Sequence, residues 1–271
     1  MDTVGLVHPI ERLRYVARAH GASQSVMVGE TAAALRSFGR DPQGLVTACR
    51  RIVDRQPSSG PLWWLAARTL TAPDPITEAQ LAAAEIEDDR TPRAVADALP
   101  EDATVLLLGW PELAPGGLPR RGDLEVLVCD VDGDGTDLVL RLLRADVDAD
   151  DIPMSGLGAA AAQADVTVLE TSAMGPGGFL APSGSRAAAS TARLAGNAVW
   201  LVAGVGRLLP ERMFTALCDR TISADSPWDD DLELVPLDLV DKVVGPTGPA
   251  NPVDSLRRTD CPVAPELLKP F

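Results

Sequence analysis

The sequence predicts an α/β protein in two parts: a helical N-terminal subdomain over residues 1–97 and a Rossmann-like domain over residues 98–271. Apolar residues recur at helical spacing in the first part, and from residue 102 short apolar runs of strand length replace that pattern. Residues 165–203 give a strand, a glycine-rich loop, an alanine-rich helix and a second strand in succession. Such alternation indicates a parallel sheet with right-handed crossovers.

Several signals for helix starts occur in the N-terminal subdomain. Proline is favoured in the first helical turn, and an Asp or Thr before it can cap the free N–H groups. The pattern Thr77-Glu-Ala-Gln80 is a capping box. The apolar segment 61–65, which contains two tryptophans, is expected to fill a helical core rather than to line a pocket. The predicted helices begin at Pro9 (residues 10–19), Asp41-Pro42, Thr77 and Thr91-Pro92.

The second part is expected to alternate strands, helices and loops. Apolar runs bounded by Gly, Pro or Asp predict strands at residues 104–108, 124–129, 166–170, 198–203 and 232–235. Helices are expected at residues 136–144, 156–163, 183–196 and 208–217. Residues 115–119, 174–178 and 226–231 are predicted loops, and 236–244 a short terminal helix or turn. The tail from Gly245 is rich in proline and is expected to wrap a surface or a partner.

Composition narrows the class of protein. A hydrophobic fraction of 46% is ordinary for a globular chain, and a formal net charge of −15 opposes extended contact with nucleic acid or an anionic membrane. No apolar run approaches the roughly 18–20 residues that span a bilayer. The four cysteines are widely separated, which argues against a zinc site or a disulfide scaffold. We expect a cytoplasmic protein of arginine-rich, bacterial composition that needs no cofactor or metal.

A potential anion site lies where the helix of residues 183–196 begins. Ligands of parallel sheets bind at the carboxyl ends of the strands, where helix N-termini offer unpaired N–H donors. The turn Gly184-Ser185 is expected to hold a phosphate through its backbone N–H groups, with help from Arg186 and Ser183. The competing interpretation is that Ser183 or Ser185 simply caps the helix.

Several segments occur in an order that identifies a family. They are Ala164-Asp-Val-Thr-Val-Leu-Glu170, Gly177-Gly-Phe-Leu-Ala-Pro-Ser-Gly-Ser185, residues 197–202 and residues 233–244. Residues 56–68 are similar to the "RPTAVNLxWALDR" element of isomerases. The chain resembles the family of eukaryotic initiation factor 2B (eIF2B) regulatory subunits (alpha, beta and delta), which includes ribose-1,5-bisphosphate and methylthioribose-1-phosphate isomerases. The resemblance implies a NagB/RpiA/CoA-transferase-like sheet and a phosphorylated small molecule as ligand.

The residues that carry isomerase chemistry in that family differ here. The aspartate of the family segment "GADAV" corresponds to Ser172, and "NK" corresponds to Ala181-Pro182. The expected catalytic cysteine falls near Gly109-Trp110. Because the acid and the thiol are both missing, proton transfer has no obvious agent. The resemblance therefore implies a catalytically degenerate protein that binds a phosphorylated sugar or nucleotide. The expected ligand-binding residues are Gly109, Asp130, Asp132, Glu170, Ser172, Ser183, Gly184, Ser185 and Arg186.

Two enzymatic alternatives remain open. A sugar-phosphate isomerase would need relocated catalytic residues, for which Asp130, Asp132 and Glu170 are candidates. A haloacid-dehalogenase-like phosphatase would use Asp130 as nucleophile and Asp132 as acid after the strand of residues 124–129. A calcium loop fails because Arg141 stands where a bidentate Glu is required. The simplest interpretation of residues 130–135 is a solvated acidic turn.

Self-association is also expected from the resemblance. A second copy would dock through the C-terminal half and form a homodimer or a higher homo-oligomer. Apolar side chains in the predicted terminal segment would otherwise face water. They are Leu237, Val240, Val243 and Val244.

Overall fold

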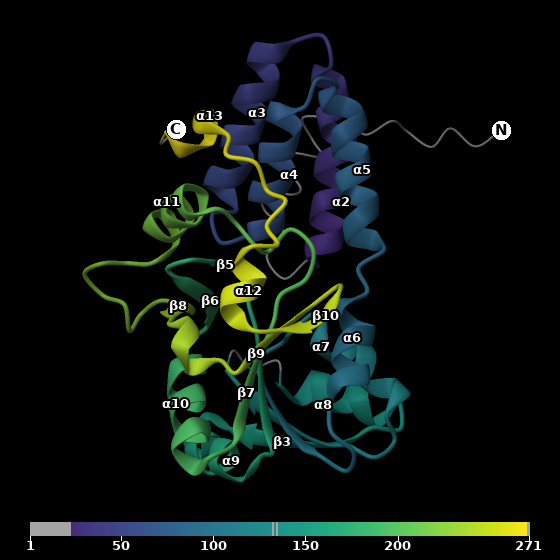
Figure 1. Ribbon diagram of the computed structural model, residues 1–271, viewed down its shortest axis with the longest axis vertical. Helices are drawn as coiled ribbons and strands as arrows, with labels where there is room; N and C mark the ends of the chain where they lie inside the picture. The colour runs from purple at the N-terminus through teal and green to yellow at the C-terminus, as the bar shows by residue number, and fades with distance from the viewer. Residues whose placement is uncertain (1–22, 132, 134, 270–271) are drawn as a thin grey trace, which may run out of the picture.

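The computed structural model describes residues 23–131, 133 and 135–269. Its chain forms a helical cluster stacked on a layered sheet, with the helices at the top of Figure 1 and the sheet below. The predicted helix at residues 10–19, both histidines and Asp132 lie outside the described residues. Within the described part of the chain, no helix is long and apolar enough to cross a membrane.

The helical cluster begins with α2 (Gln24–Leu35), η1 (Arg36–Phe38), α3 (Pro42–Arg55), α4 (Gly60–Thr71) and α5 (Pro75–Glu87). The start predicted at Asp41-Pro42 is confirmed, because the Asp41 carboxylate accepts the Gly44 N–H at 2.9 Å. The start predicted at Thr77 is wrong. Asp74 caps α5 instead and accepts from the Thr77 N–H at 3.2 Å, since Asp-Pro provides both the cap and the first-turn proline.

The core of this cluster confirms the predicted role of the two tryptophans. Trp63 and Trp64 of α4 are fully buried. The Arg68 guanidinium lies 4.5 Å from the Trp64 ring centroid, and that of Arg220 lies 4.9 Å from the Trp63 ring centroid. The C-terminal part of the chain returns to this core through α11 (Glu211–Thr221) and α13 (Pro265–Leu268), which contact each other. The proline-rich tail therefore does wrap the protein's own surface (Figure 1).

The main sheet has seven strands in the order β10-β9-β7-β4-β1-β2-β3, all parallel except β10. Two predicted strands of this sheet match their observed bounds, β1 (Thr104–Leu108) and β4 (Val166–Glu170), as does the predicted strand 232–235 outside it. The strands of residues 165–203 pair as predicted, since β4 runs parallel to β7 with Val166 opposite Ala198. The remaining strands are β2 (Glu125–Asp130), β3 (Asp148–Pro153), β7 (Ala198–Val202), β9 (Lys242–Gly245) and β10 (Gly248–Ala250).

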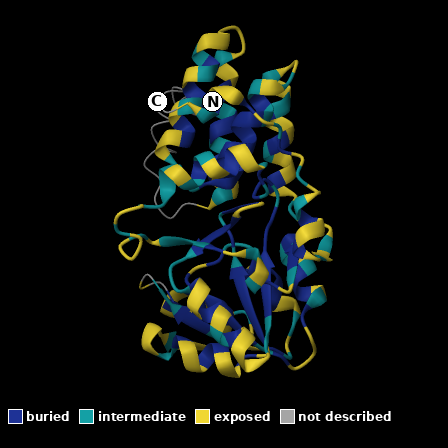
Figure 2. Ribbon diagram, turned by 60° about the vertical axis from the view of Figure 1, so that its left-hand side comes forward, coloured by how far each residue is buried: buried dark blue, intermediate teal, exposed yellow. Residues whose placement is uncertain are grey.

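Helices cover both faces of this sheet and make a sandwich of three layers. One face packs against α6 (Thr91–Ala98), α7 (Ala114–Gly117) and α8 (Gly135–Leu143). The other packs against α9 (Leu157–Gln163) and α10 (Ser185–Ala195). Figure 2 shows the strands buried between exposed helix surfaces. Short helices complete the chain: η2 (Leu118–Arg120), η3 (Met154–Gly156), η4 (Leu237–Leu239) and α12 (Pro252–Leu256).

Three sequence predictions are wrong in this part. Residues 115–119 are not a loop, because the short helices α7 and η2 occupy them. Residues 174–178 are not a flexible loop, because β5 (Ala173–Gly175) and β6 (Gly178–Pro182) form an antiparallel hairpin that pairs with β8 (Leu232–Val235). The segment 236–244 is not a terminal helix or turn, because it contains η4 followed by the strand β9. The Gly and Pro residues that suggested a loop lie in and beside the tight turn between β5 and β6.

The prediction of an exposed apolar docking face is also wrong. Val243 and Val244 belong to β9, inside the main sheet, and both are buried within the chain. Val240 is buried as well, and Leu237 packs partly against the same core. These side chains are covered by this chain's own helices and strands, so they no longer require a second copy.

Candidate functional site

The parallel strands bring their carboxyl ends to one edge of the sheet, which faces the helical cluster (Figure 1). Gly109 follows β1, Asp130 ends β2 and Glu170 ends β4 at this edge. Three of the predicted ligand-binding residues therefore lie at the ends of neighbouring strands. The structure gives each of them a partner within the chain.

Glu170 caps the short helix α7. Its Oε2 accepts the N–H groups of Leu113 at 2.9 Å and Ala114 at 3.0 Å, and its Oε1 accepts the N–H of Glu112 at 2.9 Å. Oε1 also lies 2.8 Å from Nη1 of Arg207. The side chain of Glu170 is only 7% exposed. A buried carboxylate in this position is satisfied by helix donors and by a counter-charge.

Arg207 lies after β7 and contacts residues at the ends of β1 and β4. Its Nη1 donates to the Thr171 carbonyl at 2.6 Å, and its Nη2 lies 3.0 Å from Oε2 of Glu112. The arginine side chain is 5% exposed and that of Glu112 is 27% exposed. Burial raises the pKa of Glu112, although the nearby Arg207 opposes this shift. We call Glu112, Arg207 and Glu170 the edge cluster: two carboxylates that share one buried guanidinium.

The N-terminus of α4 approaches the same edge closely. The Gly60 N–H donates to the Ser172 carbonyl at 3.1 Å. A Cβ at Gly60 would lie 2.6 Å from that carbonyl oxygen, so only glycine permits the contact. The Ser172 hydroxyl is buried and has no hydrogen-bond partner among the described residues. Ser172 therefore lies between helix and sheet, where its carbonyl fixes α4.

Asp130 forms an internal turn. Its Oδ1 accepts the N–H groups of Gly133 at 2.6 Å and Gly135 at 3.2 Å, at the start of α8. This is the arrangement expected of an acidic turn that caps a helix. The Gly109 N–H donates to the Cys129 carbonyl at 2.9 Å. The Cys129 thiol is buried, and burial, together with nearby Asp130, raises its pKa, which disfavours the thiolate that a nucleophile requires.

The predicted phosphate site at the start of α10 already holds a carboxylate. Oε1 of Glu233 accepts the N–H groups of Gly184 at 2.8 Å and Arg186 at 2.9 Å. The Arg186 side chain donates to the Leu234 carbonyl. The Ser183 hydroxyl donates to the Asp230 carbonyl at 2.6 Å, and the Ser185 hydroxyl is buried with no partner among the described residues. An anion would have to displace Glu233 to bind here.

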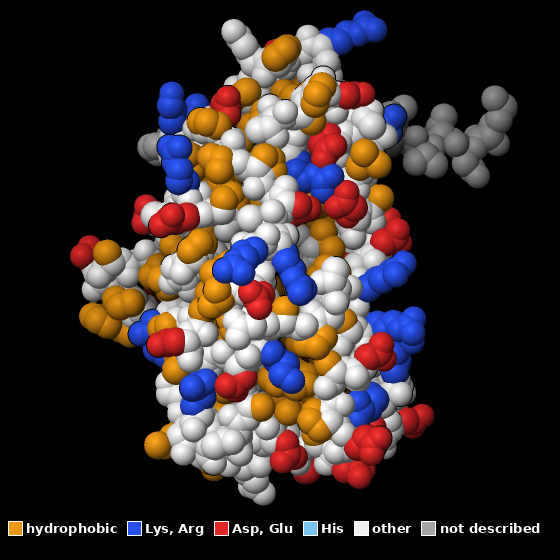
Figure 3. All heavy atoms as spheres, viewed as in Figure 1, with side chains coloured by type: hydrophobic (Ala, Val, Ile, Leu, Met, Phe, Trp, Pro, Cys, Tyr) orange, Lys and Arg blue, Asp and Glu red, His pale blue; other side chains and the backbone are white. Residues whose placement is uncertain are grey.

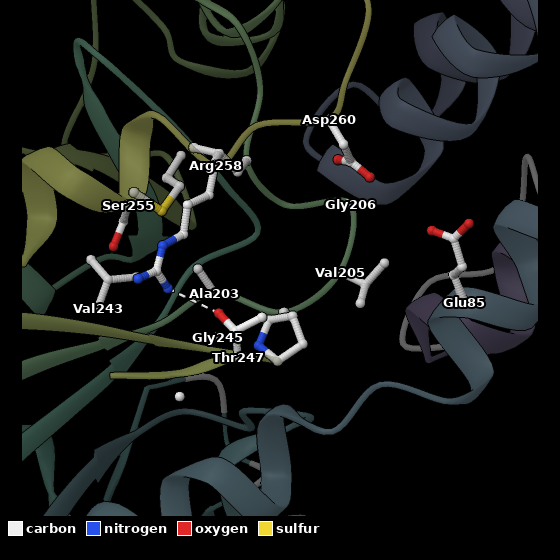
Figure 4. Close-up of a pocket in the computed structure, with 15 residues that line it drawn as sticks. Glu85, Ala203, Val205, Gly206, Val243, Gly245, Thr247, Ser255, Arg258 and Asp260 are labelled. Atoms are coloured by element: carbon white, nitrogen blue, oxygen red, sulfur yellow. Dashed lines mark hydrogen bonds between the residues drawn. The ribbon is translucent and has the colours of Figure 1, made fainter. Parts of the chain in front are cut away.

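A pocket of about 280 Å³ lies at the ends of β7 and β9. Its floor is the loop that follows β7, residues 203–206, and one wall is the turn between β9 and β10. Figure 4 shows Arg258 at one side of this space and Glu85 and Asp260 at the other. None of the ligand-binding residues predicted from sequence lines it.

Three residues that complete the edge cluster and the start of α10 were not predicted from the sequence. Arg207 follows Gly204-Val-Gly206, a glycine pattern too short to indicate a dinucleotide site. Glu112 lies in a segment without a local motif, and Glu233 begins the family segment of residues 233–244, which does not show what its carboxylate contacts. Their contacts join residues 37 to 95 positions apart, which periodicity cannot report. Two signals could have drawn notice: a lone arginine placed directly after a strand and a glycine turn, and Glu233 at the start of the family segment 233–244.

The solved structures that are similar to this chain include several eIF2B proteins. The Pyrococcus horikoshii OT3 translation initiation factor eIF-2B is similar with a TM-score of 0.75 and 13% identity, over 92% of this chain and 98% of that one. The eIF2B beta subunit from Chaetomium thermophilum gives 0.73 and 16%, over 97% and 93%. A chain of the tetrameric eIF2B-beta2-delta2 complex from C. thermophilum gives 0.75 and 16%, over 92% of each chain. No protein-family model and no curated protein matches the sequence.

These neighbours confirm the predicted fold: a helical N-terminal region followed by a mostly parallel sheet, in the arrangement of eIF2B subunit structures. Chemically, the sheet edge offers carboxylates that already hold N–H groups or an arginine, and a thiol that burial keeps protonated. The pocket beside it offers one arginine, two carboxylates and apolar walls.

Proposed function

We propose that this chain is a member of the eIF2B regulatory-subunit family that binds a phosphorylated sugar or nucleotide without isomerising it. The fold shared with the eIF2B structures over at least 92% of the chain supports membership. We infer the absence of isomerisation from the edge cluster of Glu112, Arg207 and Glu170.

Isomerisation of a sugar phosphate requires a group that accepts a proton and returns it. Glu170 is the carboxylate at the end of β4, and three backbone N–H groups and Arg207 hold it. In the alignment that the resemblance suggests, Glu170 stands at the glycine of "GADAV" and Ser172 at the aspartate. The edge cluster thus puts an ion pair where the isomerases have an uncharged glycine, and a hydroxyl where they have the acid.

Binding of a small anion is physically compatible with the same edge. The carboxyl ends of parallel strands are where ligands of open α/β sheets bind. The pocket at the ends of β7 and β9 lies there and contains an arginine. Loss of catalysis at one part of the edge therefore does not remove the capacity to bind at another.

Two measurements on the purified protein test this function. Thermal unfolding is followed with ribose 5-phosphate, AMP and inorganic phosphate, and conversion of ribose 1,5-bisphosphate and methylthioribose 1-phosphate is followed by chromatography. A ligand at a hundred times its Kd is expected to stabilise by about 2.7 kcal/mol, with no conversion. Turnover that Glu170→Gln abolishes would instead support an isomerase with relocated catalytic residues. No shift with any phosphate compound would refute binding.

We also propose that the chain self-associates. One similar structure is described as a tetrameric complex of two beta and two delta subunits. Light scattering behind size exclusion is expected to give at least twice the chain mass of 28.4 kDa. A mass of one chain at micromolar concentration would contradict this part of the proposal.

A further inference from the structure

The pocket at the ends of β7 and β9 has a basic end. Arg258 follows α12, and its Nη1 donates to Oγ1 of Thr247 at 2.9 Å, in the turn between β9 and β10 (Figure 4). This contact uses one of five guanidinium donors, and the Thr247 hydroxyl keeps its own proton to donate. On the face shown in Figure 3, two basic side chains, with an acidic one beside them, lie over the region where α12 lies in Figure 1. Such an end fits a phosphate group.

The opposite end of the pocket is acidic. Both carboxylate oxygens of Glu85 bind Arg68, at 2.7 Å and 3.0 Å. Arg68 also pairs with Glu78 and lies 3.9 Å from Asp260. Glu85 and Asp260 line the pocket, and with Arg68 beside them they leave a net charge of −1 (1 − 2) at this end. Figure 4 shows Glu85 and Asp260 across the pocket from Arg258. A ligand group placed here should carry positive charge.

The space between the two ends is small and largely apolar. Val205, Val243 and Met174 line it, with Ala203 and Leu208. Its volume of about 280 Å³ is just below the lower limit of about 300 Å³ usual for pockets that enclose a drug-sized ligand. A single sugar ring fits this volume better than a base, a ribose and a phosphate together.

We infer that this pocket binds a zwitterionic, monosaccharide-sized phosphomonoester. Its phosphate lies against Arg258 and Thr247, and its ammonium group lies against Glu85 and Asp260. The inference rests on the proposed function, since it gives the phosphorylated ligand a location and a charge. The ligand also joins the two parts of the protein, because Glu85 belongs to α5 of the helical cluster and Thr247 to the turn between β9 and β10.

The charge assignment is tested by two sugars that differ in one group. Glucosamine 6-phosphate carries an ammonium where glucose 6-phosphate carries a hydroxyl. Calorimetric titration of the full chain at low salt is expected to show tighter binding of the amino sugar, on the order of tenfold. Asp260→Asn keeps an acceptor for the Trp64 indole N–H, which Asp260 now accepts at 3.0 Å, and removes one charge. Asp260→Asn is expected to reduce the preference for glucosamine 6-phosphate over glucose 6-phosphate to about threefold, while glucose 6-phosphate still binds.

The location is tested by a matched pair of neighbouring arginines. Arg258→Ala is expected to weaken both sugars by at least about tenfold, since a charge-assisted contact to phosphate is lost. Arg257→Ala removes an equal charge one residue away, where Arg257 pairs with the exposed Asp254 and does not line the pocket. It is expected to change affinity less than about twofold. Unchanged melting temperatures show that both variants fold.

The outcomes separate this inference from the proposed function. If the wild-type chain binds neither sugar phosphates nor AMP, the proposed function fails and the inference fails with it. If it binds them and Arg258→Ala binds equally well, only the location is wrong; a simultaneous loss in Arg186→Ala would place the ligand at α10 instead. Equal affinity for the two sugars overturns the ammonium assignment.

Discussion

Replacement of Arg207 by Met tests whether the edge cluster is as deeply buried as the structure indicates. Methionine keeps a long unbranched side chain but removes the charge and all five donors. Glu170, 7% exposed, would lose its counter-charge, and the Thr171 carbonyl would lose its donor. Removing one partner of a buried ion pair typically costs about 3–5 kcal/mol, because the other charge stays desolvated.

That loss is large against a typical total stability of about 5–15 kcal/mol. Urea unfolding followed by tryptophan fluorescence measures it as a shift of the midpoint at constant slope. The matched control is Arg193→Met: this arginine is 42% exposed and pairs with Asp241, 43% exposed, at 3.0 Å. An exposed ion pair contributes about 0–1 kcal/mol, so the urea midpoint of Arg193→Met should stay close to that of the wild type.

A second variant separates charge from packing. Glu112→Gln, Glu170→Gln and Arg207→Met combined leave no charge in the edge cluster, and the amide carbonyl that replaces the Glu170 carboxylate can still accept a helix N–H. The triple variant is expected to recover part of the stability that Arg207→Met loses. A loss below about 1 kcal/mol in Arg207→Met, equal to that of the exposed control, would refute the buried edge cluster.

Three further predictions follow from single groups. Burial raises the pKa of Glu112, so the stability linked to its protonated form is fully present below the ordinary Glu pKa and is lost as pH rises through the pKa of the folded state. The urea midpoint of Glu112→Gln should therefore be higher than that of the wild type near neutral pH. This difference should shrink toward about pH 4. Glu233→Ala removes the carboxylate at the start of α10 and should cost about 1 kcal/mol by urea unfolding, whereas an unchanged midpoint would mean that Glu233 does not cap the helix. Burial raises the pKa of Cys49 and Cys261 to about 12, so a thiol reagent at mildly alkaline pH should label them only after unfolding; rapid labelling of the native protein would contradict their burial.

Local patterns predicted the strands that are buried on both faces of the sheet. Residues 104–108 and 166–170 are short, apolar or β-branched runs, and their observed strands have the same bounds. β3 escaped prediction because its sequence, Asp148-Ala-Asp-Asp-Ile-Pro153, is mostly polar. It lies at the end of the strand order, where an edge strand keeps much of its surface in water.

The candidate site was less accessible to sequence reasoning. The position of Glu170 at the end of a parallel strand could be predicted, since the strand itself was predictable. Its pairing with Arg207 could not, because the contact depends on how the loops after β4 and β7 meet. At the start of α10 the N–H donors of Gly184 and Arg186 are present as predicted, but both donate to the carboxylate of Glu233 in β8. Donors can be read from a sequence, whereas their occupancy depends on the tertiary fold.

A crystal structure of the chain soaked with glucosamine 6-phosphate tests the central claim most directly. We predict density between Arg258 and Asp260, with the phosphate against Arg258 and with the contacts between Arg207 and both carboxylates of the edge cluster unchanged. Density for the sugar beside Ser172, with Glu170 turned away from Arg207, would contradict it and would make the end of β4 the candidate active site.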